Sequence, residues 1–250
     1  MRLTWSKCAL LVVSSLLYSV SSGAQQPPEI VFDVSSVKPA HDQNAPAIRR
    51  LDIGTVSVQS MTLYDMIELF YHVRSYQIVG GPEWTKRERF DVVGKDSSAR
   101  TRSRPEGDAL TAAFRAGDEQ MRQLLKNRFQ LELRPEIRVL PTLVLFADKE
   151  KTFTQVPCSS EYWLQHGLVK GAIRITSLTA LLKAEYGMQV NDATELIGCY
   201  DIEAHWTTDP DNETLPSITT ALKDLGFYLK KSTGNVDILV VEHAEKPLPD

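Results

Sequence analysis

The sequence predicts an α+β fold made of two related halves, in which helices pack on one face of mixed β-sheets. Apolar residues recur with the spacing of a helical face in four segments, and they alternate with polar residues in several others. The order of segments is the same in both parts of the chain: strand, helix, strand, strand, helix, strand, strand. Because amphipathic helices cover the apolar face of a sheet, this order indicates a two-layer arrangement in each half.

The first half begins, after a proline-containing linker, with a strand expected from Val31 to Val37. A helix is expected over residues 62–73, with Thr62 or Ser60 as its N-cap. Its apolar face has helical spacing and consists of Leu63, Met66, Ile67 and Phe70. The elements expected next are strands at 76–79 and 90–94, a charged loop at 96–107, a helix ending near Phe129, and strands at 130–133 and 139–147.

The second half repeats this order in fewer residues. A helix capped by Thr176 or Ser177 is expected after a strand at 173–175. The apolar face of this helix contains Leu178, Leu181 and Leu182. The elements expected next are strands at 188–190 and 200–206, a helix at 215–225, and strands at 228–229 and 236–241.

Landmarks at corresponding places indicate an internal duplication. They are Leu63 with Leu178, residues 90–92 with 200–202, and Phe129 with Phe227, at offsets of 115, 110 and 98. We therefore predict a first half at residues 25–150 and a second half at 151–250. The strands at 139–147 and 236–241 are apolar on both faces, so we expect them to be central, where the halves meet.

The first 24 residues have the features of a secretory signal peptide. Arg2 and Lys7 precede an apolar run from Cys8 to Val20, and the small residues Ser22-Gly23-Ala24 precede the expected cleavage site. The run is short for a bilayer, and no later segment approaches about 18 consecutive apolar residues. We therefore expect export to the periplasm or the cell exterior and a soluble mature chain without a membrane span. An uncleaved anchor is the alternative.

Composition and motifs exclude several classes of function. Lys and Arg number 28 against 32 Asp and Glu, a net charge of −4, so no general basic surface exists for nucleic-acid phosphates. No nucleic-acid partner is expected. The sequence contains no Gly-x-Ser-x-Gly elbow, no P-loop and no paired-histidine zinc motif. We expect no cofactor and no metal, and no motif names a reaction.

Export changes how the cysteines are interpreted. Cys8 leaves with the signal peptide, and Cys158 and Cys199 would enter an oxidising compartment where a disulfide persists. A bridge between them would close a loop of about 40 residues and hold the segment between the halves against the second sheet. A disulfide is therefore the candidate pairing, and two separate buried thiols are the alternative.

One loop is the candidate partner-binding site. In Gly80-Gly81-Pro82-Glu83-Trp84, the glycines permit positive φ and the proline fixes the next turn. Trp84 either packs over this bend, which we favour, or stands out as an anchor for a partner protein. The site residues of the second interpretation are Gly80, Gly81, Pro82 and Trp84.

A second row of residues has metal-type side chains. Cys199, Asp201, Glu203 and His205 alternate along one expected strand. Alternate strand residues are about 6.6 Å apart, so the ends of this row are about 20 Å apart and cannot share one ion. We interpret the row as a solvated face opposite buried residues. The five histidines are likewise assigned structural roles, because none has the spacing of a metal site.

Four ordered blocks carry a resemblance to a known family: residues 32–39, residues 80–84 with 88–91, residues 124–129, and residues 240–247. They resemble the soil-associated secreted proteins that are abundant in acidobacteria, a family of unknown function. The resemblance covers nearly the whole mature chain and implies export, but it supplies no catalytic residues. The segment between Trp206 and Leu215 is shorter here than in many members. At the level of architecture, the halves also resemble short N-terminal domains of secretins and TonB-dependent receptors, which are protein-interaction modules.

These observations predict an extracytoplasmic interaction or scaffold module. It would meet an envelope or extracellular protein partner through sheet edges or the Trp84 loop. The alternative is an extracytoplasmic hydrolase whose site is assembled from histidines and acidic residues distant in sequence. A cleft holding His205 or His243 against a carboxylate would favour the enzyme, and an exposed apolar patch near Trp84 would favour binding. The sequence does not indicate an oligomeric state.

Overall fold

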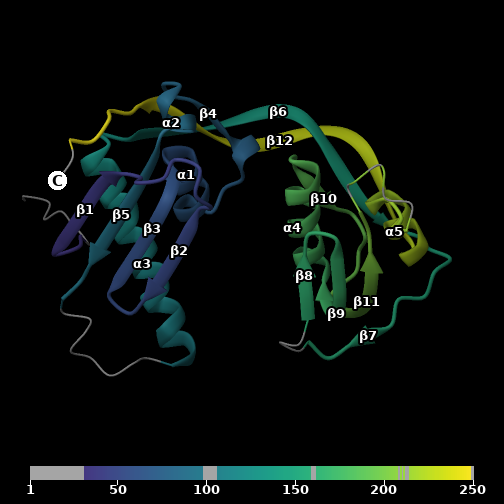
Figure 1. The fold of residues 1–250 in the computed structure, drawn as a ribbon. Helices are drawn as coiled ribbons and strands as arrows, with labels where there is room; N and C mark the ends of the chain where they lie inside the picture. Colours follow the sequence, from purple (N-terminus) through teal and green to yellow (C-terminus); the bar gives the residue numbers. More distant parts are fainter. Residues whose placement is uncertain are drawn as a thin grey trace, which may run out of the picture.

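The computed structural model describes residues 31–97, 106–158, 162–207, 209, 211 and 214–248. Figure 1 shows two lobes joined by a long two-stranded ribbon. Each lobe combines helices with a β-sheet, so the predicted α+β class is confirmed. The predicted signal peptide at residues 1–24 and most of the predicted charged loop lie outside the described residues.

The first lobe consists of an antiparallel sheet with helices on one face. Its strand order is β1 (Val34–Pro39), β5 (Arg89–Lys95), β3 (Thr55–Thr62) and β2 (Ile48–Asp52). The helices are α1 (Leu63–Tyr71), α2 (Trp84–Arg87) and α3 (Gly107–Arg128), and a short 3₁₀ turn, η1, covers Ser75–Gln77. Apolar residues of α1 and α3 share one core with those of β3 and β5.

The local sequence explains why α1 forms where it does. Thr62 is the N-cap: its side chain accepts a hydrogen bond from the backbone N–H of Asp65, and the Asp65 carboxylate accepts one from the N–H of Thr62. This capping box satisfies two otherwise unpaired donors of the first turn. The predicted apolar face is confirmed, because Leu63, Met66, Ile67 and Phe70 are fully buried. Of the two expected caps, Thr62 is the right one and Ser60 is not.

Helix α3 also ends as the sequence predicts. Phe129 is its C-cap, and Met121, Leu124 and Leu125 are buried against the first-lobe sheet. Its exposed residues include Asp108, Arg115 and Lys126, as expected for the outer face of a helix that packs on a sheet. In the part of the chain that the structure describes, no helix has the length and apolar content needed to cross a membrane.

The second lobe has the same arrangement. Its sheet has the order β7 (Gln155–Val156), β11 (Cys199–His205), β9 (Leu168–Arg174) and β8 (Tyr162–Gln165). It is covered by α4 (Ile175–Tyr186) and α5 (Ile218–Leu225). Two sequence-based boundaries are wrong. Arg174 precedes α4, so Thr176 and Ser177 lie within its first turn, and α5 begins three residues later than expected because Ser217 caps it.

A third sheet joins the lobes. Its order is β10 (Val190–Asp192), β6 (Glu132–Ala147), β12 (Phe227–His243) and β4 (Ile78–Gly80). The long antiparallel strands β6 and β12 cross between the lobes, as Figure 1 shows in teal and yellow. Leu143 and Leu145 of β6 belong to the second-lobe core, whereas Val241 of β12 belongs to the first. The halves therefore exchange strands, and the two long strands are central, as expected.

The sequence-based division of β6 and β12 into two strands each is wrong. Both are continuous, with one irregularity in β12 between Val241 and His243. β6 contains proline at positions 135 and 141, and neither disturbs the pairing with β12. The N–H of Leu143 donates to the carbonyl of Gln189, the residue before β10, so the backbone N–H and C=O groups of odd-numbered β6 residues point away from β12. Pro135 and Pro141 share this direction, and therefore neither removes a hydrogen bond from the β6–β12 ladder.

The hairpin of β2 and β3 was not predicted. Thr55–Thr62 alternates polar and apolar residues, with Val56 and Val58 buried, which is a recognisable strand pattern. The two-residue turn contains Gly54 at φ 68°, a conformation that glycine adopts without a Cβ clash. The strand that leads into the first helix is therefore β3, and the expected strand near Val31–Val37, observed as β1, lies at the sheet edge.

The two lobe sheets have equivalent strand orders. β1, β5, β3 and β2 correspond in turn to β7, β11, β9 and β8. The buried residues 63, 66, 67 and 70 of α1 correspond to 175, 178, 179 and 182 of α4, an offset of 112. The expected match of Leu63 with Leu178 is therefore wrong by one helical turn. We propose that the chain is an internal duplication, and the boundary between residues 150 and 151 stays a prediction.

Candidate functional site

The Gly80–Trp84 segment is built for close packing between β4 and β12. Gly80 has φ 83°, and a Cβ added there would lie 2.8 Å from the carbonyl oxygen of Val241. A Cβ on Gly81 would lie 3.0 Å from a methyl group of Val241. Only glycine allows β12 to approach this bend so closely. Pro82 is exposed and precedes the short helix α2.

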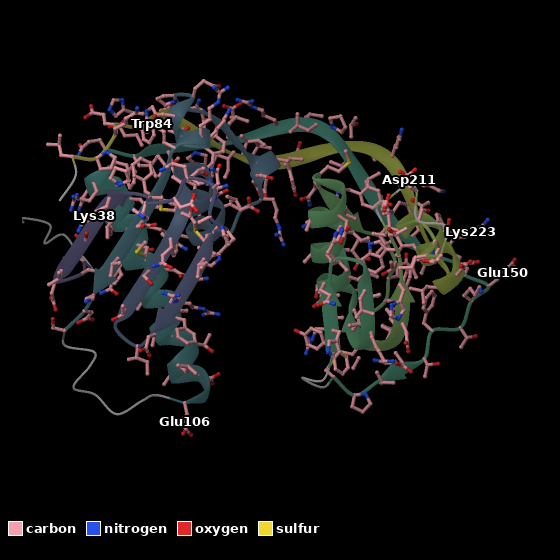
Figure 2. The ribbon with its side chains drawn as sticks, viewed as in Figure 1. Lys38, Trp84, Glu106, Glu150, Asp211 and Lys223 are labelled. Atoms are coloured by element: carbon pink, nitrogen blue, oxygen red, sulfur yellow. A yellow bond between two sulfur atoms is a disulfide. The ribbon has the colours of Figure 1, made fainter. Side chains whose placement is uncertain are left out.

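Trp84 begins α2 and packs against the first-lobe core, at the upper end of that lobe in Figure 2. Its ring stacks on Phe129 at 6.3 Å between centroids and meets Phe90 edge-on at 6.1 Å. It is only partly exposed, and the exposed apolar side chains of the described residues do not include it. These contacts agree with the packing interpretation, and partner binding at this loop stays a prediction.

Cys158 and Cys199 form a disulfide, the pairing that the sequence favours. Their Cα atoms are 5.3 Å apart, and 41 positions separate them in sequence. Cys199 is buried at the start of β11, where it pairs with Val156 of β7. The disulfide therefore fastens the chain after β7 to the second-lobe sheet.

Reduction of this disulfide is expected to lower the free energy of unfolding by about 3 kcal/mol, because the unfolded chain regains the freedom of a long loop. Urea unfolding of the oxidised protein with and without reductant measures the difference. The double variant Cys158→Ala and Cys199→Ala is the control, because reductant should not change its midpoint. Two free thiols in denatured, non-reduced protein would contradict the expectation.

The row on β11 does not form a metal site in the described residues. Cys199 is in the disulfide, whereas Asp201, Glu203 and His205 lie on the exposed face. Glu203 accepts a hydrogen bond from Lys170 at 2.9 Å, and this contact lowers the pKa of the Glu203 carboxyl. His205 lies 3.8 Å from the same carboxylate. The interpretation of the row as a solvated face therefore fits Asp201, Glu203 and His205, but it is wrong for Cys199, which is buried because it is in the disulfide.

In the described part of the first lobe, His72 contacts a buried carboxylate. Its Nε2 lies 3.3 Å from Oδ2 of Asp118 on α3, whose side chain is only 8% exposed. Arg49 of β2 donates to the other oxygen of the same carboxylate. The three residues therefore join β2, the end of α1 and α3. A shallow pocket beside His72 has Asp65, Glu68 and Arg74 in its lining, but no serine, threonine or cysteine.

Among the other described histidines, His166 contacts a buried carboxylate of the second lobe, because its Nδ1 lies 2.8 Å from Glu185, whose side chain is only 3% exposed. His243 pairs with its exposed neighbour Glu245 at 3.0 Å. Neither His205 nor His243 is among the residues that line the described pockets. Within these pockets, neither histidine has the arrangement that would have favoured the hydrolase.

A row of exposed apolar residues lies on β6, between the lobes. Four alternate residues there point the same way and are exposed, and we call them the apolar rib: Pro135, Ile137, Val139 and Pro141. Ile137 is 66% exposed and Val139 is 71% exposed. Leu133 and Leu143 lie on the same face of β6 as the rib, one before it and one after it. Leu133 packs against the first-lobe core, and Leu143 belongs to the second-lobe core. Its own residues contribute to neither core.

The matching pairing of β6 and β12 supplies an internal comparison for the rib. Leu143 of β6 and Leu239 of β12 are equivalent, because each pairs with the first residue of the parallel strand beside it. This sets an offset of 239 − 143 = 96 within the ribbon. The residues equivalent to the rib are Lys231, Thr233, Asn235 and Asp237, which are all exposed and polar. The fold therefore does not require apolar side chains at these positions.

The opposite face of β6 carries a charge network. Glu136 accepts hydrogen bonds from Arg134 at 3.0 Å and from Arg138 at 2.6 Å, and Arg134 also bonds Glu242 of β12. The bonds from Arg138 and Arg134 lower the pKa of Glu136 from 4.5 to about 2. The network is exposed, so we assign it a modest role in holding the ribbon in one conformation.

Acid is expected to remove the contribution of Glu136 to stability. Between pH 4.5 and about 2 the unfolded chain protonates this carboxyl while the folded chain does not, so falling pH favours unfolding. The contribution is fully present above pH 4.5. Glu136→Gln should therefore be less stable than the wild type at pH 7, and the two proteins should converge as the pH approaches 2. A constant difference in unfolding midpoint across this range would contradict the assignment.

Fold and surface together define an α+β protein of two bridged lobes with an exposed apolar rib on β6. Comparison with family models adds the family: residues 64–244 match a protein family of unknown function, DUF3738, and the chain belongs to that family. No curated protein and no solved structure matches the chain. The expected membership of a family of unknown function is confirmed, while its association with soil and acidobacteria stays a prediction.

Proposed function

We propose that this protein is an exported interaction module and that a partner protein binds the apolar rib of β6. The observation that carries the proposal is the contrast between the two strands of the ribbon. Isolated exposed apolar residues are common on protein surfaces. Here, however, Ile137 and Val139 lie side by side on one strand where the equivalent residues, Thr233 and Asn235, are polar.

The rib has enough apolar surface to contribute usefully to binding. Covering an exposed isoleucine or valine side chain contributes roughly 1.5 to 3 kcal/mol. Covering Ile137 and Val139 therefore favours a complex by about 3 kcal/mol once their present partial burial is allowed for. Apolar anchors with a polar surround are typical of interaction sites. Asp237 and Asn235, which face Ile137 and Val139 across the ribbon, supply that polar surround.

Export is supported by two independent features. The first 24 residues have the charged start, apolar run and small residues of a signal peptide. The Cys158–Cys199 disulfide suits an oxidising compartment, because such bonds are rare where thiols are kept reduced. We place the proposed interaction in the periplasm or outside the cell.

The test replaces Ile137 and Val139 of the rib with the residue types at the equivalent positions of β12, threonine and asparagine. The double variant Ile137→Thr and Val139→Asn should keep the melting temperature of the wild type, because neither side chain is buried. Tagged wild-type and variant proteins are incubated with the envelope fraction and culture fluid of the source cells. Quantitative mass spectrometry then compares the proteins that each retains.

We expect one or a few proteins to be retained by the wild type and lost from the double variant. Ile197→Thr is the matched control, because it makes the same chemical change at a residue that is 85% exposed and lies outside the ribbon. Partners that bind the wild type, the double variant and the control equally would overturn the proposal.

A further inference from the structure

We infer that the partner at the rib is an extended polypeptide segment that adds to the free edge of β6 as a further strand. This inference rests on the proposed function and specifies how the partner binds. It is carried by the backbone of β6, which is paired with β12 on one side along its length. On its other side, β10 covers only Leu143 to Leu145.

The uncovered edge presents unpaired backbone groups. Odd-numbered residues of β6 point their N–H and C=O groups away from β12, as the bond from Leu143 to Gln189 establishes. Ile137 and Val139 share this direction, and no hydrogen bond within the described residues uses their outward backbone groups. Such an edge is a template for strand addition.

The prolines of the rib decide which strand fits. Pro135 and Pro141 also point outward, so each offers a carbonyl but no N–H. The edge thus offers carbonyls at all four rib residues but N–H groups only at Ile137 and Val139. The complementary segment has N–H groups facing both prolines and apolar side chains over the middle of the rib.

A second copy of this chain meets that requirement in only some registers. Antiparallel pairing of two β6 edges that joins Ile137 to Val139 would place Pro135 opposite Pro141 of the other copy, where neither proline carbonyl finds a donor. Pairing centred on Ile137 would place Pro135 opposite Val139 and Pro141 opposite Leu133, where β6 packs against the first-lobe core. A short segment of a different protein brings no lobes to this edge and is the occupant that we propose; a wild-type dimer that Val139→Pro abolishes would overturn this choice. Because the rib spans seven residues, the segment has a length of about seven residues in extended form.

Contacts within the ribbon hold the β6 edge in an extended conformation before any partner binds. β6 is held by the full β12 ladder on one side, and the Arg134–Glu136–Arg138 network fixes its opposite face. Little conformational freedom remains for the edge to lose when a strand is added, so a short segment is sufficient for measurable affinity.

The experiment separates strand addition from side-chain contact alone. Random twelve-residue peptides displayed on phage are selected on the wild-type protein, with counter-selection on the Ile137→Thr, Val139→Asn double variant. Selected peptides are then measured against Val139→Pro, which removes one outward N–H but no bond of the β12 ladder. Val139→Ile is the matched control, because it keeps both the N–H and the apolar surface.

We expect the selected peptides to bind Val139→Ile like the wild type and to bind Val139→Pro at least tenfold more weakly. Amide hydrogen exchange supplies a second readout that needs no proline variant. Bound peptide should slow the exchange of the Ile137 and Val139 amides in the wild-type protein. This measurement decides the question even if Val139→Pro fails to fold.

Two results would overturn strand addition. If peptides depend on the rib but bind Val139→Pro like the wild type and leave the two amides unprotected, strand addition is wrong while the proposed function stands. If selection yields no peptide whose binding depends on Ile137 and Val139, strand addition is wrong as well. Loss of partner proteins from the double variant then decides separately whether the rib binds at all.

Discussion

A chain that ends at residue 150 is expected to give no folded monomer. Its last strand, β6, would carry Leu143 and Leu145 out of the first lobe, because these residues belong to the second-lobe core. The first lobe would in turn lack Val241 and the β12 strand that pairs with β4. Figure 2 shows Glu150 at the far side of the second lobe, which illustrates how far the first half extends into its neighbour.

The effect should be large, because each half loses core residues and sheet pairing together. Loss of a few buried aliphatic side chains exceeds the net stability of a small domain. Residues 31–150 and 151–248 are therefore expressed separately and together, and circular dichroism and light scattering measure folding and mass. We expect no folded monomer of either part, but a one-to-one folded complex when both are present. A cooperatively melting monomer of residues 31–150 would contradict the exchange of strands.

Phe129→Ala is expected to destabilise the protein by about 4 kcal/mol. Phe129 is fully buried where α3 ends, and its ring lies 5.2 Å from Phe90 and 6.3 Å from Trp84. Truncation removes the transfer free energy of the ring and leaves a cavity that helix and strand cannot close. It also removes the ring on which Trp84 stacks, so near-ultraviolet circular dichroism of the tryptophans should change.

Trp163→Ala is the control for this measurement. Trp163 is also aromatic, but it lies on the edge strand β8 and is 55% exposed, so its loss should change stability by about 0.5 kcal/mol or less. Chemical unfolding of the three proteins gives both differences. Equal stability of Phe129→Ala and Trp163→Ala would contradict the assignment of Phe129 to the first-lobe core.

The elements predicted well from sequence are those with local signals. The face of α1 follows from residues within two helical turns, and its cap was narrowed to Thr62 or Ser60; Asp65, three positions after Thr62, is the local signal that decides between them. The disulfide follows from cysteine count and expected compartment, which require no geometry. The hairpin of β2 and β3 also has a local signal, the alternation around Val56 and Val58, so sequence reasoning should have found it.

The ribbon was beyond local reasoning for a physical reason. Whether a proline interrupts a strand depends on the side to which its missing N–H would have pointed, and only the pairing of β6 with β10 and β12 sets that side. Whether a β6 side chain is buried also depends on the neighbouring elements and not on the local sequence. Ile137 and Val139 resemble Leu143 and Leu145 in sequence, yet only the latter pair lies beneath the second-lobe helices.

The candidate binding site therefore differs between sequence and structure: the sequence indicated the Trp84 loop, and the structure indicates the rib of β6. Trp84 was the strongest anchor visible in the sequence, but Phe90 and Phe129 hold its ring. The rib had a signal that was not recognised: apolar residues at 135, 137, 139 and 141 alternate with the charged residues at 134, 136 and 138. Such alternation predicts a strand with one apolar face, and only the structure tells whether that face is covered.

Site-specific photo-crosslinking in living cells tests the central claim, that the rib is the binding surface, most directly. A benzophenone amino acid replaces Val139 in one protein and Ile197 in another, since both residues are strongly exposed and only the first lies on the rib. We predict a light-dependent adduct with another protein from position 139 and none from position 197. No adduct from position 139, or the same adducts from both positions, would contradict the claim.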